Sequence, residues 1–217
     1  MSDGPGMQVA YLLYDRFTAL DITGPHEVLN SVPGFESVFV GEVVGPYRNE
    51  SDTLSLVADL SLEEVPEPDV LVVPGGFGTR ALLDHQPLLG WIRKVDRTTT
   101  WTTSVCTGSL LLAAAGLLDG RPATTHWLAR ETLAGLGAEP VPDRVVFDGK
   151  YVTGAGVSAG IDMAFALIEE IHGPELAQAV QLGIEYDPQP RHDAGAPEKA
   201  PPEIVDAVTA AFAQNRL

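Results

Sequence analysis

Short apolar runs that alternate with longer helical patterns constrain the fold of this sequence more than any other feature. Residues 7–14, 69–76 and 98–105 each have the composition of a buried strand, and a helical pattern follows each of them. Continuous apolar strands are typical of parallel sheets covered on both faces. Strand–helix alternation predicts helices on those faces. We therefore expect an α/β fold with a mostly parallel sheet, whose chemistry lies beyond the carboxyl ends of the strands.

The rest of the chain continues this pattern. An antiparallel hairpin is predicted within 143–156, with Asp148-Gly149 at its turn. We expect residues 1–6 to be a short flexible leader and 187–203 to be an extended proline-rich segment. Because no internal linker is visible, we expect one domain over 1–217. The predicted helices have an apolar face or end at a helix-breaking residue. They include 23–32, 87–98, 108–118 and 158–173, and Thr23 is the predicted N-cap of the first.

Charge and cysteine content exclude several classes of protein. The chain has 217 residues, a formal net charge of −17 and one cysteine. Such acidity disfavours binding to nucleic acid, which needs a basic surface. A single cysteine forms no internal disulfide, so nothing requires an oxidising compartment. No apolar run reaches the roughly 18 residues of a membrane span. We expect a cytoplasmic protein that binds neither nucleic acid nor membrane.

Cys106 lies where a predicted strand is followed directly by a helix, without loop residues between them. This is the geometry of a nucleophile elbow, a tight turn that holds a side chain at the edge of the sheet. The N–H groups and dipole of the following helix favour thiolate, which predicts a pKa below the ordinary value of about 8.5. A lone cysteine is also often inert packing. The strand–turn–helix context makes the two interpretations about equally strong.

Two further stretches reach the same predicted edge. Asp21 precedes the first predicted helix, where an acid commonly complements the helix dipole. If Asp21 contacts Cys106, the two groups titrate as a coupled pair and share a proton. The segment "PGGFG" (74–78) follows the second strand. It is either a simple tight turn or a loop whose backbone N–H groups, especially that of Gly76, approach a substrate. It is not a phosphate-binding motif.

The histidines give a weaker signal. His126 follows Cys106 by twenty residues and is either a hydrogen-bonded structural residue or part of a pocket. The other four show no paired ligand spacing, and neither HExxH nor CxxC occurs. We therefore expect no metal.

Four segments together resemble the ThiJ/PfpI superfamily and, within it, the isocyanide hydratases: "LDITGPHEVL", "VVPGGFG", "SVCTGSLLLAAAGLLDGRPATTHW" and "VTGAGVSAGIDMAFALIEEI". The resemblance covers about residues 7–190. It implies a flavodoxin-like three-layer sandwich, a homodimer and no cofactor. The branch also contains sensor domains of AraC-type regulators, so the motif alone does not define an enzyme.

The resemblance also implies roles for individual residues. Cys106 would be the nucleophile, Asp21 its acidic partner, and Thr107 a hydrogen-bond donor beside it. Gly76 would contribute a backbone N–H to the substrate. Protease-like relatives carry His after the cysteine, and Thr107 there argues against a Cys-His peptidase. Relatives often have three glycines where this chain has Gly154-Ala155-Gly156.

The expected reaction is hydration of an isocyanide to an N-formyl amine through a covalent thioimidate on Cys106. Asp21 would first donate a proton and then activate water. An apolar pocket for the substrate would include Phe77, Trp127 and Val157, with His126 as a further pocket residue. The alternatives are a glyoxalase-like or other cysteine-dependent hydrolase, a redox-active stress protein, and a ligand-sensing domain, because fold alone does not fix function.

Overall fold

A seven-stranded sheet forms the centre of the computed structural model, which describes residues 6–214. All neighbouring strands of this sheet are parallel except the pair at one edge, β10 and β11, which is antiparallel. In spatial order the strands are β10 (Val145–Asp148), β11 (Tyr151–Gly154), β7 (Trp101–Val105), β6 (Val70–Val73), β1 (Met7–Leu12), β2 (Phe35–Gly41) and β5 (Leu60–Ser61).

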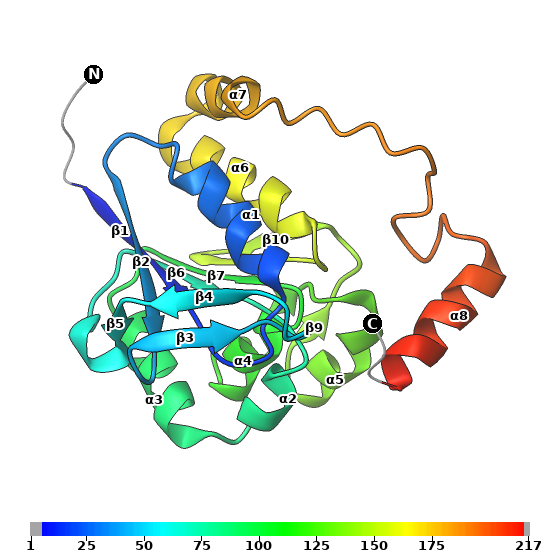
Figure 1. Cartoon of the computed structure of the whole chain (residues 1–217), viewed down its shortest axis with the longest axis horizontal. Helices are drawn as coiled ribbons and strands as arrows, with labels where there is room; N and C mark the ends of the chain where they lie inside the picture. The colour runs from blue at the N-terminus through cyan, green and yellow to red at the C-terminus, as the bar shows by residue number, and fades with distance from the viewer. Residues whose placement is uncertain (1–5, 215–217) are drawn as a thin grey trace. The chain divides into compact units, whose positions relative to one another are not determined.

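Helices cover both faces of the sheet, so the three-layer, flavodoxin-like α/β sandwich predicted from the sequence is confirmed (Figure 1). On one face, α1 (Ala19–Leu29) packs on α6 (Ala159–His172), and α6 packs on α7 (Pro174–Gly183). The helices of the other face are α2 (Thr79–Leu82), α3 (Gln86–Asp96), α4 (Gly108–Ala114) and α5 (Arg130–Gly135).

Short elements fill the connections between these layers. The antiparallel hairpin of β3 (Gly45–Arg48) and β4 (Ser55–Ala58) follows β2. A bridge between Phe17 and Asn49 joins this hairpin to the loop after β1. The remaining elements are the parallel pair β8 (Pro122–Ala123) and β9 (Glu139–Pro140), and the 3-10 turns η1 (Leu62–Glu64) and η2 (Trp127–Ala129).

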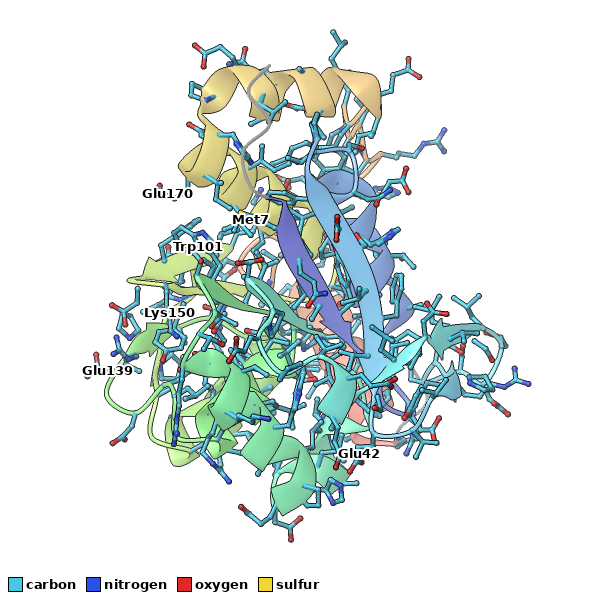
Figure 2. The ribbon with its side chains drawn as sticks, turned by 90° about the vertical axis from the view of Figure 1, so that its left-hand side faces the viewer. Met7, Glu42, Trp101, Glu139, Lys150 and Glu170 are labelled. Carbon is cyan, nitrogen blue, oxygen red and sulfur yellow. The ribbon has the colours of Figure 1, made fainter. Side chains whose placement is uncertain are left out.

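The core strands are buried because helices lie on both sides of them. Every residue of β6 is buried, as are the last four residues of β1. Figure 2 shows the direction of the strands: Met7 and Trp101 mark the starts of β1 and β7, and Glu42, just after β2, lies at the opposite end of the sheet. The loops that follow β1, β6 and β7 therefore leave the sheet at the end where Glu42 lies.

Two helix boundaries differ from the prediction. Helix α1 begins at Ala19 rather than Thr23, so Asp21 lies in its first turn and Thr23 caps nothing: its hydroxyl donates to the Ala19 carbonyl one turn back. Helix α4 ends at Ala114 instead of continuing to 118. Gly116 follows with φ 78°, a left-handed conformation that ends helices and suits glycine. The predicted hairpin of β10 and β11 is confirmed, with Gly149 at φ 60° in its turn.

The chain divides into two compact units, Met1–Ile184 and Glu185–Leu217. The second contains α8 (Pro202–Ala213), preceded by residues 187–201 without helix or strand, so the predicted extended segment ends slightly earlier than 203. A single domain over 1–217 stays a prediction. The predicted leader, apart from Gly6, lies outside the described residues. Across 6–214, no helix has the length and apolarity needed to cross a membrane.

Candidate active site

Cys106 occupies the strained turn between β7 and α4. Its φ of 56° is a left-handed conformation that non-glycine residues rarely adopt. Its N–H donates to the carbonyls of Gly154 (3.0 Å) and Ala155 (3.1 Å). Its carbonyl accepts from the hydroxyls of Thr125 (3.0 Å) and Ser109 (3.2 Å). These four bonds hold the strained backbone in place, as the elbow geometry predicted from the sequence requires.

The start of α4 lies directly against the end of β6. A Cβ at Gly108 would stand 2.1 Å from the carbonyl oxygen of Val73, so only glycine fits there. This close approach brings Thr107 and the elbow against the "PGGFG" loop. The two chain segments meet without a side chain between them.

Asp21 is the acid of this site. It lies in the first turn of α1 and is completely buried, whereas Cys106 is 5% exposed. Asp21 Oδ2 accepts a hydrogen bond of 2.8 Å from the Gly75 N–H. Among the described residues, Oδ1 has no hydrogen-bond partner of ordinary geometry, yet the Cys106 thiol lies near enough that each group shifts the pKa of the other. The predicted contact between Asp21 and Cys106 is present.

Two consecutive glycines shape the loop beside Asp21. A Cβ at Gly75 would stand 2.5 Å from the Thr107 nitrogen and 2.9 Å from Asp21 Oδ2. Gly76 has φ 133°, and its N–H donates to Thr107 Oγ1 at 2.9 Å. The Gly76 N–H expected to contact substrate is therefore occupied by Thr107, and a direct role in substrate binding stays a prediction.

Burial controls the protonation of the pair. It raises the pKa of Asp21 well above its ordinary value, and the hydrogen bond from Gly75 only partly opposes this. Burial, followed by the charge of Asp21, likewise raises the pKa of Cys106. The backbone N–H of Thr107 lowers the Cys106 pKa, but it is the weaker effect. The prediction of a lowered cysteine pKa is thus wrong, because removal from water outweighs the helix N-terminus. Both shifts favour the protonated forms of the pair.

Phe77 lies among charged side chains at the same loop. It is buried, and the guanidinium groups of Arg16 and Arg80 stand 5.7 Å and 5.0 Å from its ring centroid. These distances are those of cation–π contacts. The half-buried Glu50 reaches the same loop and accepts a hydrogen bond from the Phe77 N–H. An apolar ring flanked by charges therefore belongs to the same loop as Gly75, whose N–H donates to Asp21.

His126 and Trp127 lie at the start of η2, where His126 is the N-cap residue. Nδ1 of His126 accepts from the Leu128 N–H at 3.3 Å, so the side chain caps η2. Burial, together with the charges of Arg80 and Arg130, lowers the pKa of His126 to about 4. A Cβ at Gly156 would stand 2.3 Å from the His126 ring, which places this ring against the segment that anchors the elbow. This lowered pKa favours the neutral ring near pH 7. Substrate contacts by either side chain stay predictions.

Residues that the sequence analysis missed complete the surroundings. Tyr14 is buried and donates its hydroxyl proton to the Pro74 carbonyl at 2.7 Å. Its position at the end of the first predicted strand could have revealed it. Thr125 and Glu50 carry no comparable signal, because their places depend on loop conformations. Within 6–214, no group of three or more His, Cys, Asp or Glu side chains is arranged to hold a metal ion.

Comparison with known proteins identifies the family of this chain. The pattern of the DJ-1/PfpI family matches residues 7–170, which is well over half of the chain. The protein therefore belongs to the DJ-1/PfpI family.

Individual relatives differ in their described roles. An isonitrile hydratase from Pseudomonas putida is 44% identical over 200 residues, covering 92% of this chain and 87% of that protein. The transcriptional regulator CdhR from Pseudomonas aeruginosa is 39% identical over 132 residues, 60% of this chain but 39% of the regulator. The crystal structure of a ThiJ/PfpI family protein from Pseudomonas syringae superposes with a TM-score of 0.93 at 36% identity, covering 97% of this chain and 88% of that one.

Proposed function

We propose that this protein hydrates isocyanides to N-formyl amines, with Cys106 as nucleophile. The observation that carries the proposal is the buried Asp21 carboxyl, whose Oδ1 lacks an ordinary hydrogen-bond partner among the described residues and which lies beside the only thiol of the chain. The similarity to the isonitrile hydratase from Pseudomonas putida, which extends over 92% of this chain, supports it.

In the first step the Cys106 sulfur bonds to the terminal carbon of the isocyanide. Addition needs one proton on that same carbon. Asp21 delivers the proton that the pair shares while the Cys106 thiolate bonds to the carbon, and Asp21 is left as a carboxylate. The carbon–nitrogen triple bond becomes a double bond, and the product is a thioimidate that contains the whole substrate. No atom leaves in this step. The raised pKa values of the two groups support this step, because they favour a pair that holds the proton that the addition requires.

In the second step water attacks the thioimidate carbon. Asp21 accepts a proton from the water, and the tetrahedral adduct then expels the Cys106 sulfur. Asp21 passes that proton to the nitrogen and the carbon–sulfur bond breaks. The hydroxyl proton of the adduct returns to the Asp21–Cys106 pair as the N-formyl amine is released. One carboxyl thus acts as acid and then as base, which is usual for a two-step covalent mechanism.

Thr107 contributes by linking Cys106 to the loop after β6. Its N–H donates to the Cys106 sulfur, and its hydroxyl accepts from the Gly76 N–H at 2.9 Å. The N–H at the sulfur favours thiolate as the addition proceeds. Phe77 and Trp127 would supply apolar surface to the substrate. The mechanism uses no cofactor, and we further propose that the protein acts as a cytoplasmic homodimer.

The test is turnover of para-nitrophenyl isocyanide, followed by ultraviolet absorbance, with the product identified by mass spectrometry. The proposal predicts steady formation of the N-formyl amine at catalytic enzyme concentration. Absence of product from enzyme with a fully reduced Cys106 would contradict it. Saturable binding of the isocyanide without turnover would instead favour a ligand-sensing role, which the similarity to CdhR makes the second candidate.

A further inference from the structure

Glu50 connects two loops of the site although it lies far from both in sequence. It follows β3, and its N–H donates to the Phe17 carbonyl at 2.9 Å. The carboxylate accepts from the Thr18 hydroxyl at 3.0 Å and from the Phe77 N–H. One side chain therefore holds the loop before α1 and the loop after β6 together.

These two loops carry the groups around Asp21. Thr18 immediately precedes α1, and its N–H donates to the Gly75 carbonyl at 2.9 Å. Gly75 in turn donates to Asp21 Oδ2 at 2.8 Å. A displacement of Thr18 or Phe77 would therefore move Gly75 and, with it, the Asp21 carboxyl. Glu50 acts on Asp21 through these neighbours, without a hydrogen bond to it.

Charged groups surround Glu50 on both sides. Arg16 and Arg80 flank the Phe77 ring and favour the ionised form of Glu50, as do the hydrogen bonds from Thr18 and Phe77. Burial opposes them and is the larger effect, so the pKa of Glu50 is raised. The groups that its negative charge reaches in turn are Asp21, Cys106 and Tyr14, whose pKa values it raises. A like charge nearby favours the protonated form of each.

We propose that Glu50 is a positioning residue that fixes the two loops around Asp21 and, through its negative charge, helps the Asp21–Cys106 pair to keep its proton. The positioning half of this role rests on the hydrogen bonds that Glu50 accepts from Thr18 and Phe77. The electrostatic half rests on the place of its carboxylate at the two loops that border Asp21, together with the direction in which its charge shifts the pKa values of the pair. Its consequence for turnover rests on the proposed function. Nothing in the sequence pattern points to this residue, because the contact forms only when the β3–β4 hairpin meets the loop after β1.

The experiment measures alkylation of Cys106 by iodoacetamide between pH 6 and pH 10. The chain has one cysteine, so the rate reports on this thiol alone. Glu50→Gln keeps an oxygen that accepts hydrogen bonds but removes the charge. The matched control is Glu36→Gln, an equal change in net charge at an exposed residue near the start of β2, at the other end of the sheet.

We expect Glu50→Gln to move the alkylation profile to lower pH by about half a unit, roughly a threefold faster reaction on the rising limb. Glu36→Gln should leave the profile unchanged. Glu50→Ala should give the same shift and, because its hydrogen bonds are also lost, a larger loss of turnover than Glu50→Gln. A Glu50→Gln profile that coincides with the wild type, or an equal shift in Glu36→Gln, would overturn the proposal.

The same variants separate this proposal from the proposed function. In isocyanide turnover, the alkaline limb of kcat/KM should move to lower pH in Glu50→Gln, because the pair loses its proton earlier. If no isocyanide is turned over but the alkylation profile still shifts, the hydratase proposal fails and the electrostatic role of Glu50 stands. If turnover occurs and neither profile shifts, Glu50 has no such role.

Discussion

Asp21 Oδ2 accepts a 2.8 Å hydrogen bond from the Gly75 N–H, while Oδ1 is buried without an ordinary partner among the described residues. The Cys106 thiol lies close enough to this carboxyl that each group shifts the pKa of the other. An unsatisfied buried oxygen is costly and needs a reason. The reason that follows from the proposed mechanism is proton transfer, because this buried carboxyl is the group available to exchange a proton with the thiol and the substrate. Apart from Cys106, Asp21 is therefore the residue whose substitution tests the mechanism best.

Asp21→Asn should nearly abolish isocyanide turnover. Asparagine keeps the shape and an acceptor for the Gly75 N–H, but it has no acidic proton to deliver. General acid–base catalysis contributes about 10²–10⁴-fold, and we expect kcat to fall by that order. The control is Glu27→Gln, at an exposed residue of the same helix, which should keep wild-type kcat. A kcat of Asp21→Asn within tenfold of the wild type would argue against proton delivery by Asp21.

Gly75→Ala should reduce both stability and turnover. The added Cβ would stand 2.5 Å from the Thr107 nitrogen and 2.9 Å from Asp21 Oδ2, so the loop or the acid must shift. Overpacking of this kind costs about 1–3 kcal/mol of unfolding free energy. Denaturant titration measures this loss. The control is Gly90→Ala inside α3, where the Cβ would meet only Arg93 at 3.9 Å. It should stabilise by about 0.5–1 kcal/mol, and equal effects of the two changes would refute the argument.

Thr107→Val should destabilise the site through the loop it holds. Valine has the same shape but leaves the buried Gly76 N–H without its 2.9 Å acceptor. An unsatisfied buried donor costs about 1–3 kcal/mol, measured by denaturant titration. Thr23→Val is the control, because the Thr23 hydroxyl bonds only within α1, to the Ala19 carbonyl. If Thr107→Val is as stable as Thr23→Val, this hydrogen bond does not hold the loop.

His126 should make stability depend on pH in the acid range. Its pKa falls from 6.5 to about 4 in the folded protein, because burial disfavours the charged ring. A depressed pKa means that the unfolded chain takes up the proton first as pH falls. The free energy of unfolding is therefore unaffected by this group above about pH 6.5 and falls progressively below it. The loss reaches about 3 kcal/mol near pH 4.

The measurement for His126 is the free energy of unfolding at pH 7 and pH 4.5, compared with His126→Asn. Asparagine still caps a helix turn but does not titrate in this range. The wild type should lose more stability between the two pH values than the variant. An NMR titration of the ring with a midpoint near 6.5 would contradict the buried, neutral state.

Much of the fold could be read from the sequence, because its strands are continuous apolar runs. Once the sheet was predicted to be parallel, Asp21, the "PGGFG" loop and Cys106 had to meet at one edge. The start of α1 was misplaced because Thr23 and Pro25 together imitate a helix N-terminus, whereas the helix already begins at Ala19.

The electrostatics of the site could not be read in the same way. A helix N-terminus is visible in sequence, but complete burial of Asp21 is not, and burial decides the pKa of both groups. The partner of the Gly76 N–H and the contacts of Glu50 depend on how loops cross in space. Such contacts leave no local pattern of residues.

The most direct test of the central claim is the mass of the intact protein after rapid acid quenching of its reaction with para-nitrophenyl isocyanide. The mechanism predicts an adduct heavier than the free protein by the full mass of the isocyanide, located on the peptide that contains Cys106. Cys106→Ala should show neither the adduct nor turnover. Continued formation of the N-formyl amine by Cys106→Ala would contradict the covalent mechanism.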